Sequence, residues 1–169
     1  MTDVPPPPAR RLAATSDERT MLEAFLDDYR DIVVRKISGL SDADARRRLV
    51  DSATTAGGLV KHLRWVEYGW FDQLLTRRLD DNRRPHDREL EFRFLPDESL
   101  AELVAAYRQQ CDESRRIAAQ YPLDHQVPHR HFGLVSLRWI YLHMIEESAR
   151  HSGQLDILRE QLDGATGFD

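Results

Sequence analysis

The chain has 169 residues, of which 41% are hydrophobic and 31% are charged, and its formal net charge is −5. This length and composition fit one domain whose apolar core lies under a heavily charged surface. The negative net charge argues against a general nucleic-acid-binding protein.

The cysteine count and the hydropathy pattern exclude further classes. Cys111 is the only cysteine, so neither an intrachain disulfide nor a zinc site built from several thiolates can form. No apolar run approaches the roughly 20 residues that a membrane-spanning helix needs, and no signal-peptide pattern opens the chain. We therefore expect a cytoplasmic protein without a membrane partner. Pro5–Pro8 predict that residues 1–14 form a flexible segment and residues 15–169 a single domain.

The first long helix is predicted to begin at Thr15 or Ser16, because Thr15 and Glu18 have the spacing of a capping box. The apolar residues of one face of this helix are Met21, Leu22, Phe25, Tyr29, Ile32, Val33 and Ile37. Ser41 is then expected to cap a short extra helix over residues 42–49.

A second long helix is predicted over residues 53–79, with Ser52 as its N-cap. Gly57, Gly58 and Gly69 lie inside this helix, where each glycine costs roughly 1 kcal/mol relative to alanine. Close packing against another helix is the expected reason for these three glycines.

Residues 80–97 contain turn-forming and helix-breaking residues and predict an irregular connection. Eighteen extended residues reach about 60 Å, whereas a helix of 27 residues is roughly 40 Å long. The connection can therefore run the length of a helix bundle and make its two neighbours parallel. The third helix is predicted to begin near Asp97 or Ser99, and Cys111 falls on its apolar face as a small buried residue.

Residues 121–133 again lack a regular pattern. This stretch holds three histidines, interpreted as loop residues, namely His125, His129 and His131. The fourth helix contains residues 139–160 and ends at Gly164. Four amphipathic helices without a convincing strand indicate an all-α fold, a four-helix bundle with a short extra helix between helices 1 and 2.

The fourth helix carries a set of candidate metal ligands. His143, Glu147 and His151 follow one another at four-residue spacing, so neighbouring members lie one helical turn apart. Two ligands from one helix do not complete a metal site, and another helix must supply the rest. His62 is the best candidate there, because it lies in the apolar-periodic second helix; alone, such a histidine is more often a hydrogen-bonded core residue. His143 competes for a ligand position.

Glu67 lies one turn plus one residue beyond His62. It is a candidate general acid or base, although an exposed surface charge is the favoured interpretation. No further catalytic residue can be named from the sequence.

Several motifs together carry a family resemblance. They are His62-Leu63-x-x-x-Glu67, Leu137-Arg138-Trp139-Ile140, His143-Met144-Ile145-Glu146-Glu147, Arg150-His151-x-Gly153 and Asp156-Ile157-Leu158-Arg159-Glu160. As a set they resemble the DinB-like metalloprotein superfamily and, within it, the actinobacterial branch described as mycothiol transferases. The resemblance covers about residues 16–167.

The resemblance implies a bundle in up-down-down-up order and one divalent metal ion held by His62, Glu147 and His151. It also implies that His143 lines the site without being a ligand. Two imidazoles and one carboxylate form the ligand set of an open catalytic zinc site, so zinc is the first expectation. The same ligands also accept nickel, manganese or iron.

A metal of this kind deprotonates a coordinated thiol, and the thiolate is the nucleophile. The sequence and the resemblance therefore predict a metal-dependent S-transferase that uses mycothiol, or bacillithiol as in other branches, to attack an electrophilic small molecule. The resemblance further implies a homodimer. The alternatives are a non-enzymatic metal-binding stress or interaction protein and a metal-dependent hydrolase.

Overall fold

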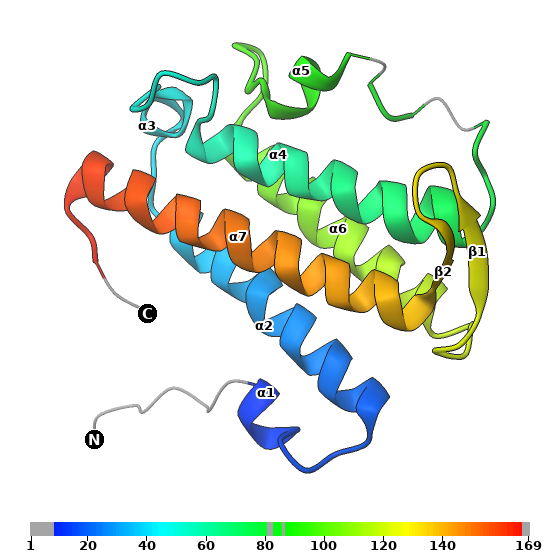
Figure 1. Ribbon diagram of the computed structural model, residues 1–169. Helices are drawn as coiled ribbons and strands as arrows, with labels where there is room; N and C mark the ends of the chain where they lie inside the picture. Colours follow the sequence, from blue (N-terminus) through cyan, green and yellow to red (C-terminus); the bar gives the residue numbers. More distant parts are fainter. Residues whose placement is uncertain (1–8, 81–82, 86, 167–169) are drawn as a thin grey trace.

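The computed structural model describes residues 9–80, 83–85 and 87–166. This part of the chain is mostly helical, with one small two-stranded sheet. Its long helices are α2 (Glu18–Ile37), α4 (Ala56–Glu67) with its π-helical continuation η1 (Tyr68–Leu75), α6 (Leu100–Ala118) and α7 (Leu137–Asp163). These helices lie side by side, and α4 and α6 run in one direction while α2 and α7 run in the opposite one (Figure 1).

The first long helix begins later than its sequence predicts. A short helix, α1 (Ala9–Leu12), precedes it within the segment expected to be a flexible lead-in, and the amide of Ser16 donates to the carbonyl of Ala13. This turn uses the residues predicted to cap α2. Asp17 caps α2 instead, through a 3.1 Å bond from the amide of Thr20 to its carboxylate. Pro5–Pro8 lies outside the described residues.

Of two further helix starts, one has the predicted N-cap and the other does not. Ser41 caps α3 (Asp42–Arg46) as expected, with the amide of Asp44 donating to its hydroxyl at 3.0 Å. The N-cap of α4 is Thr55, whereas Ser52 was expected. The Ser52 hydroxyl instead donates to the hydroxyl of Thr54 at 2.9 Å. Helix α4 therefore begins three residues later than predicted.

The connection between η1 and α6 is not wholly irregular, because it contains the short helix α5 (Arg88–Phe92). It packs against α4 and η1 at the three glycines that the sequence placed against another helix. A Cβ atom on Gly58 would overlap the carbonyl oxygen of Phe92, and one on Gly57 would overlap the ring of Phe94. A Cβ atom on Gly69 would likewise overlap the guanidinium group of Arg84. The glycines therefore form a groove for this connection. Gly58 packs against the last residue of α5, as expected for a helix partner, whereas Gly57 and Gly69 face non-helical residues.

The 121–133 stretch was wrongly predicted to lack strands. Its residues contribute to an antiparallel hairpin of β1 (Gln126–His129) and β2 (Gly133–Ser136). Val127 and Val135 are paired and buried, and Gly133 has a φ of +72°. Four-residue strands with Pro128 in one of them give too short an alternation to detect in the sequence. The amide of Leu137 donates to the carbonyl of His125, which ties the hairpin to the start of α7.

The apolar faces of α6 and α7 are buried as predicted, and Cys111 is a core residue at 3% exposure. The face of α2 differs, because Leu26 is fully buried whereas Phe25 is 41% exposed. Burial raises the pKa of the Cys111 thiol, so this group is not a ready nucleophile. The C-terminal end of α7 is capped by Gly164 with a φ of +75°, as its position in the sequence indicated.

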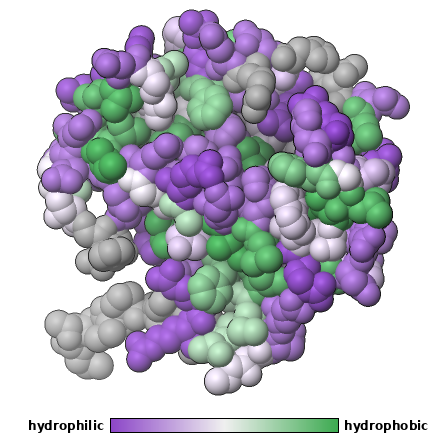
Figure 2. All heavy atoms as spheres, in the orientation of Figure 1, coloured by the Kyte–Doolittle hydropathy of each residue, from purple (hydrophilic) through white to green (hydrophobic). Residues whose placement is uncertain are grey.

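The surface agrees with the charged composition. On the face viewed in Figure 1, hydrophobic atoms form separate groups divided by hydrophilic ones (Figure 2). Among the described residues, every helix is too short or too polar to cross a bilayer.

Candidate metal centre

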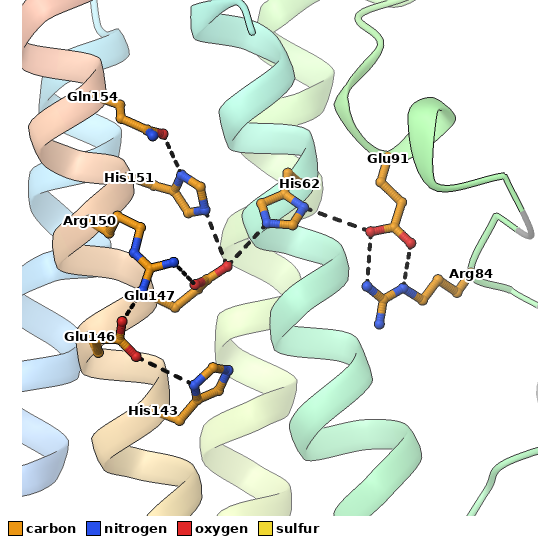
Figure 3. Close-up of polar contacts among 9 residues, drawn as sticks. All are labelled: His62, Arg84, Glu91, His143, Glu146, Glu147, Arg150, His151 and Gln154. Atoms are coloured by element: carbon orange, nitrogen blue, oxygen red, sulfur yellow. Dashed lines mark hydrogen bonds and ion pairs between the residues drawn. The ribbon is translucent and has the colours of Figure 1, made fainter. Parts of the chain in front are cut away.

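His62 on α4 meets Glu147 and His151 on α7 (Figure 3). Oε1 of Glu147 lies 3.3 Å from Nε2 of His62 and 3.2 Å from Nε2 of His151. The three potential ligand atoms all lie within 4.8 Å of one another. Both histidines are buried, at 7% and 8% exposure, and Glu147 is half-buried. The group can hold a metal ion.

The spacing of these atoms matches that of metal ligands. Two donors bound at 2.0–2.2 Å to one tetrahedral zinc ion lie about 3.3–3.6 Å apart. The carboxylate oxygen lies close to this separation from each imidazole nitrogen. Three protein donors of the types that zinc prefers leave a further coordination position open, as catalytic zinc sites do. The residues present therefore fit a divalent cation.

His151, one of the two candidate ligands on the last helix, is oriented by a neighbour on the same helix. Nδ1 of His151 lies 2.7 Å from the side-chain oxygen of Gln154, one turn further along α7. A bond donated by Nδ1–H to this oxygen leaves Nε2 as the nitrogen with a free lone pair, facing Glu147 and His62. Gln154 thus selects the tautomer that metal binding requires.

When no cation is bound, the contacts within the group favour an ionised Glu147 and a protonated His62. Hydrogen bonds from His151 and His62 lower the pKa of Glu147 well below its usual range. Burial opposes protonation of His62, but its contacts with Glu147 and Glu91 outweigh this and raise its pKa above 6.5. A cation at this position would compete with a proton for His62.

The opposite side of the His62 ring faces the connection between η1 and α6. Phe92 stacks on the ring, with a centroid distance of 3.9 Å and an interplanar angle of 15°. Nδ1 of His62 is buried and has no hydrogen-bond partner within 3.5 Å among the described residues; Oε2 of Glu91 lies 3.7 Å away. Arg84 binds Glu91 through two hydrogen bonds of 2.7 and 2.9 Å. Figure 3 shows the carboxylate of Glu91 in contact with both His62 and the guanidinium group of Arg84.

His143 lies one turn before Glu147 but outside the group of ligand atoms. Its ring stacks on Trp139 at a centroid distance of 5.3 Å and packs against Trp70 at 4.6 Å. Trp70 also stacks on the ring of His129, at a centroid distance of 5.1 Å. His143 and His129 therefore belong to one aromatic cluster between α7, η1 and the hairpin.

The remaining loop histidines stay apart from the ligands. His125 packs against Tyr121 at a centroid distance of 4.5 Å, and His131 is exposed in the hairpin turn. His129, expected in a loop, is the last residue of β1.

Glu67 was wrongly interpreted as an exposed charge. It is 1% exposed, and both carboxylate oxygens accept 2.7 Å bonds from the guanidinium group of Arg30 on α2. A buried, bidentate ion pair between two helices occupies both oxygens. The contacts of Glu67 therefore indicate a structural role.

A cavity of about 500 Å³ lies next to Glu91, and its lining residues do not include His62, Glu147 or His151. Its lining includes Trp70, Leu74, Arg84, Glu91, His129 and Arg130. It has aromatic and apolar walls together with arginine side chains, and it reaches Glu91 behind His62. A second cavity of about 650 Å³ lies at the N-terminal end of α4 and meets the site only through Phe92.

The sequence did not reveal Arg84, Glu91, Phe92 or Gln154. The first three lie in a segment without helical periodicity and reach His62 only through the folded chain. Gln154 had a detectable signal, because it follows His151 by three residues on the same helix.

Comparison with known proteins gives one family. The family described as Mycothiol-S-transferase, MST, matches residues 21–164, which include all three candidate ligands. None of the curated proteins compared with the chain matches it.

Proposed function

Because the chain belongs to the mycothiol-S-transferase family, we propose that it joins an intact small-molecule thiol, through its deprotonated sulfur, to an electrophile at a metal ion that His62, Glu147 and His151 would hold. The observation that carries the proposal is the convergence of two imidazole nitrogens and one carboxylate oxygen within 4.8 Å, from two helices far apart in the sequence.

The arrangement of the helices supports the same proposal. The parallel pair α4 and α6 and the opposite direction of α2 and α7 suit a DinB-like four-helix bundle in up-down-down-up order. In such a bundle the ligands come from side chains on facing helices. α4 supplies one ligand and α7 supplies two.

When bound, the divalent ion lowers the pKa of a coordinated thiol, so that the nucleophilic thiolate is available at neutral pH. The residues around it have separate tasks. Gln154 accepts from Nδ1 of His151 and so orients Nε2 toward the metal position, and Glu147 supplies the negative charge that a cation needs. The buried positions of His62 and His151 limit the access of water.

The cavity next to Glu91 has a suitable size for a small substrate, since small-molecule pockets span roughly 300–1,000 Å³. Its Trp70 and Leu74 walls offer apolar contact, and Arg130 offers a cationic group for a polar or anionic substituent. We propose that one of the two substrates occupies this cavity.

The experiment measures zinc content and thiol transfer in the purified protein and in three variants, His62→Ala, Glu147→Ala and His151→Ala. We expect about one zinc ion per chain and mycothiol-dependent conjugation of monochlorobimane in the unaltered protein, and loss of both in each variant. His131→Ala is the matched control, because this histidine is exposed and outside the ligand group.

Unchanged zinc content in all three variants would end the assignment of the metal centre. A protein that holds zinc at these residues but gives no thiol-dependent product above the metal-free control would contradict the transferase. Turnover of the electrophile without thiol would indicate hydrolysis.

A further inference from the structure

The connection between η1 and α6 brings a second carboxylate, that of Glu91, to the side of His62 opposite to Glu147. We propose that Glu91, held by Arg84, is a positioning residue for His62. Its carboxylate accepts a hydrogen bond from Nδ1–H of His62, so that Nε2 presents its lone pair to the metal ion. This inference rests on the proposed metal centre and extends it beyond the three ligands.

The first support is the unpaired nitrogen. Nδ1 of His62 is buried and lacks a hydrogen bond within 3.5 Å among the described residues, and Oε2 of Glu91 is 3.7 Å away. An imidazole that binds a metal through one nitrogen almost always donates its other N–H to a carboxylate, carbonyl or water. Polar contacts of this kind are often long without the ligand and shorten when the site is complete. The 3.7 Å separation needs only a small rotation of either side chain.

The second support is the cost of placing Glu91 there. Its side chain is 3% exposed, and a buried carboxylate is unfavourable unless it is paired. Arg84 pairs with it through two bonds, and this geometry fixes the orientation of the carboxylate as well as neutralising its charge. Arg84 thus holds the carboxylate next to His62.

The third support is the packing of the whole segment on α4. The ring of Phe92 stacks on His62, and the glycines at positions 58 and 69 make room for the Phe92 carbonyl and the Arg84 side chain. The connection therefore supplies Phe92 and Glu91, which lie next to His62, and Arg84, which holds Glu91. α5 is the element that positions two of them.

The test compares Glu91→Leu, which removes the acceptor, with Glu91→Gln, which keeps one acceptor oxygen at the same place. Zinc dissociation constants are measured by competition with a chelator. We expect Glu91→Leu to weaken zinc binding by about 10- to 100-fold, the usual effect of losing such a partner, and Glu91→Gln to recover part of the loss. Glu89→Leu is the matched control, because Glu89 lies on the same short helix and is exposed.

A second readout does not depend on how well the leucine variant folds. In zinc-loaded protein labelled with ¹⁵N-histidine, Nδ1–H of His62 should give a downfield, slowly exchanging proton signal, because its bond to a carboxylate is charge-assisted. Glu91→Gln should move that signal upfield, whereas Glu89→Leu should leave it in place.

The outcomes separate this inference from the proposal on which it rests. If the unaltered protein binds no zinc, the metal centre itself is refuted, and the role of Glu91 with it. If the protein binds zinc and Glu91→Leu binds it within about twofold of the unaltered protein, only the positioning role is refuted. Absence of the protected Nδ1–H signal from the unaltered, zinc-loaded protein would refute that role too.

Discussion

Arg30 and Glu67 make a buried ion pair that joins α2 to α4 on the side of α4 away from the ligand group. Both oxygens of the carboxylate accept from the guanidinium group at 2.7 Å, and Asp27 accepts a further 2.7 Å bond from Arg30. The interaction with Glu67 raises the pKa of Arg30 further, against the effect of burial. Arg30 therefore remains charged in the core.

Replacing one member of this pair should destabilise the fold and leave the metal centre intact. Breaking a buried pair typically costs about 3–5 kcal/mol, because the remaining charge loses its partner. We expect Glu67→Gln to lower the free energy of unfolding by an amount near the lower end of that range, since its amide oxygen still accepts one bond. Urea unfolding measures the loss, and zinc content should stay at the unaltered level.

The double variant Arg30→Met with Glu67→Leu serves as the control for this prediction. It removes both charges, so it should be more stable than Arg30→Met alone. A Glu67→Gln protein with unchanged stability but without thiol transfer would instead assign Glu67 to catalysis.

At the scale of the element, two glycines in helices test the groove that receives the connection. Gly58 lies against the carbonyl of Phe92, whereas nothing lies within 4 Å of a Cβ atom placed on Gly153 of α7. The same change should therefore have opposite effects at the two positions. Gly58→Ala should destabilise the protein by about 1–3 kcal/mol, the usual cost of overpacking. Gly153→Ala should stabilise it by about 0.5–1 kcal/mol, because alanine favours a helix.

Thermal unfolding measures both changes, and zinc affinity adds a second comparison. Gly58→Ala displaces the backbone beside Glu91, so it should also weaken zinc binding. Gly153→Ala lies two residues after His151 on an exposed position and should leave zinc binding unchanged. Equal shifts in melting temperature for the two variants would contradict the groove.

The elements divide into those that local sequence determines and those that it does not. α6 and α7 were predicted because their apolar residues repeat over many turns and their ends carry Ser99 and Gly164. The hairpin was missed because its strands have four residues each. The π-helical turns of η1 were missed as well, because a change from four-residue to five-residue hydrogen bonding leaves little trace in the pattern.

The candidate site shows the same division. Glu147 and His151 could be found from their spacing, since residues four apart meet on one helix. The partnership of His62 with them was implied by the family resemblance, because no local pattern relates residues 85 positions apart. Glu91 reaches the site through a fold of the connection that depends on glycines in another helix. Contacts of that kind require the structure.

At the scale of the whole molecule, a cation bound at the proposed metal centre would join α4 to α7, the second and the last of the long helices. Anything that binds the folded state alone stabilises it, by about 2.7 kcal/mol at a concentration 100 times the dissociation constant. Because unfolding separates His62 from Glu147 and His151, zinc should raise the melting temperature.

This zinc-dependent increase should itself become larger as the pH rises from 6 to 8. The pKa of His62 is raised above 6.5 in the metal-free fold by Glu147 and Glu91, against the effect of burial. The stability that protonated His62 contributes is complete below its unfolded pKa of about 6.5 and is lost as the pH passes its folded value. Zinc competes with that proton. The affinity for zinc should therefore increase over the same pH interval in which the metal-free protein loses stability.

Differential scanning calorimetry with and without saturating zinc, at pH 6, 7 and 8, measures the increase directly. His131→Gln should give the same pH dependence as the unaltered protein, because this exposed histidine lies outside the ligand group. His62→Gln should lose the zinc-dependent increase at every pH, since it removes a proposed ligand together with the group that exchanges a proton for the metal. An increase that stays constant or shrinks between pH 6 and 8 in the unaltered protein would show that the cation does not displace a proton from His62.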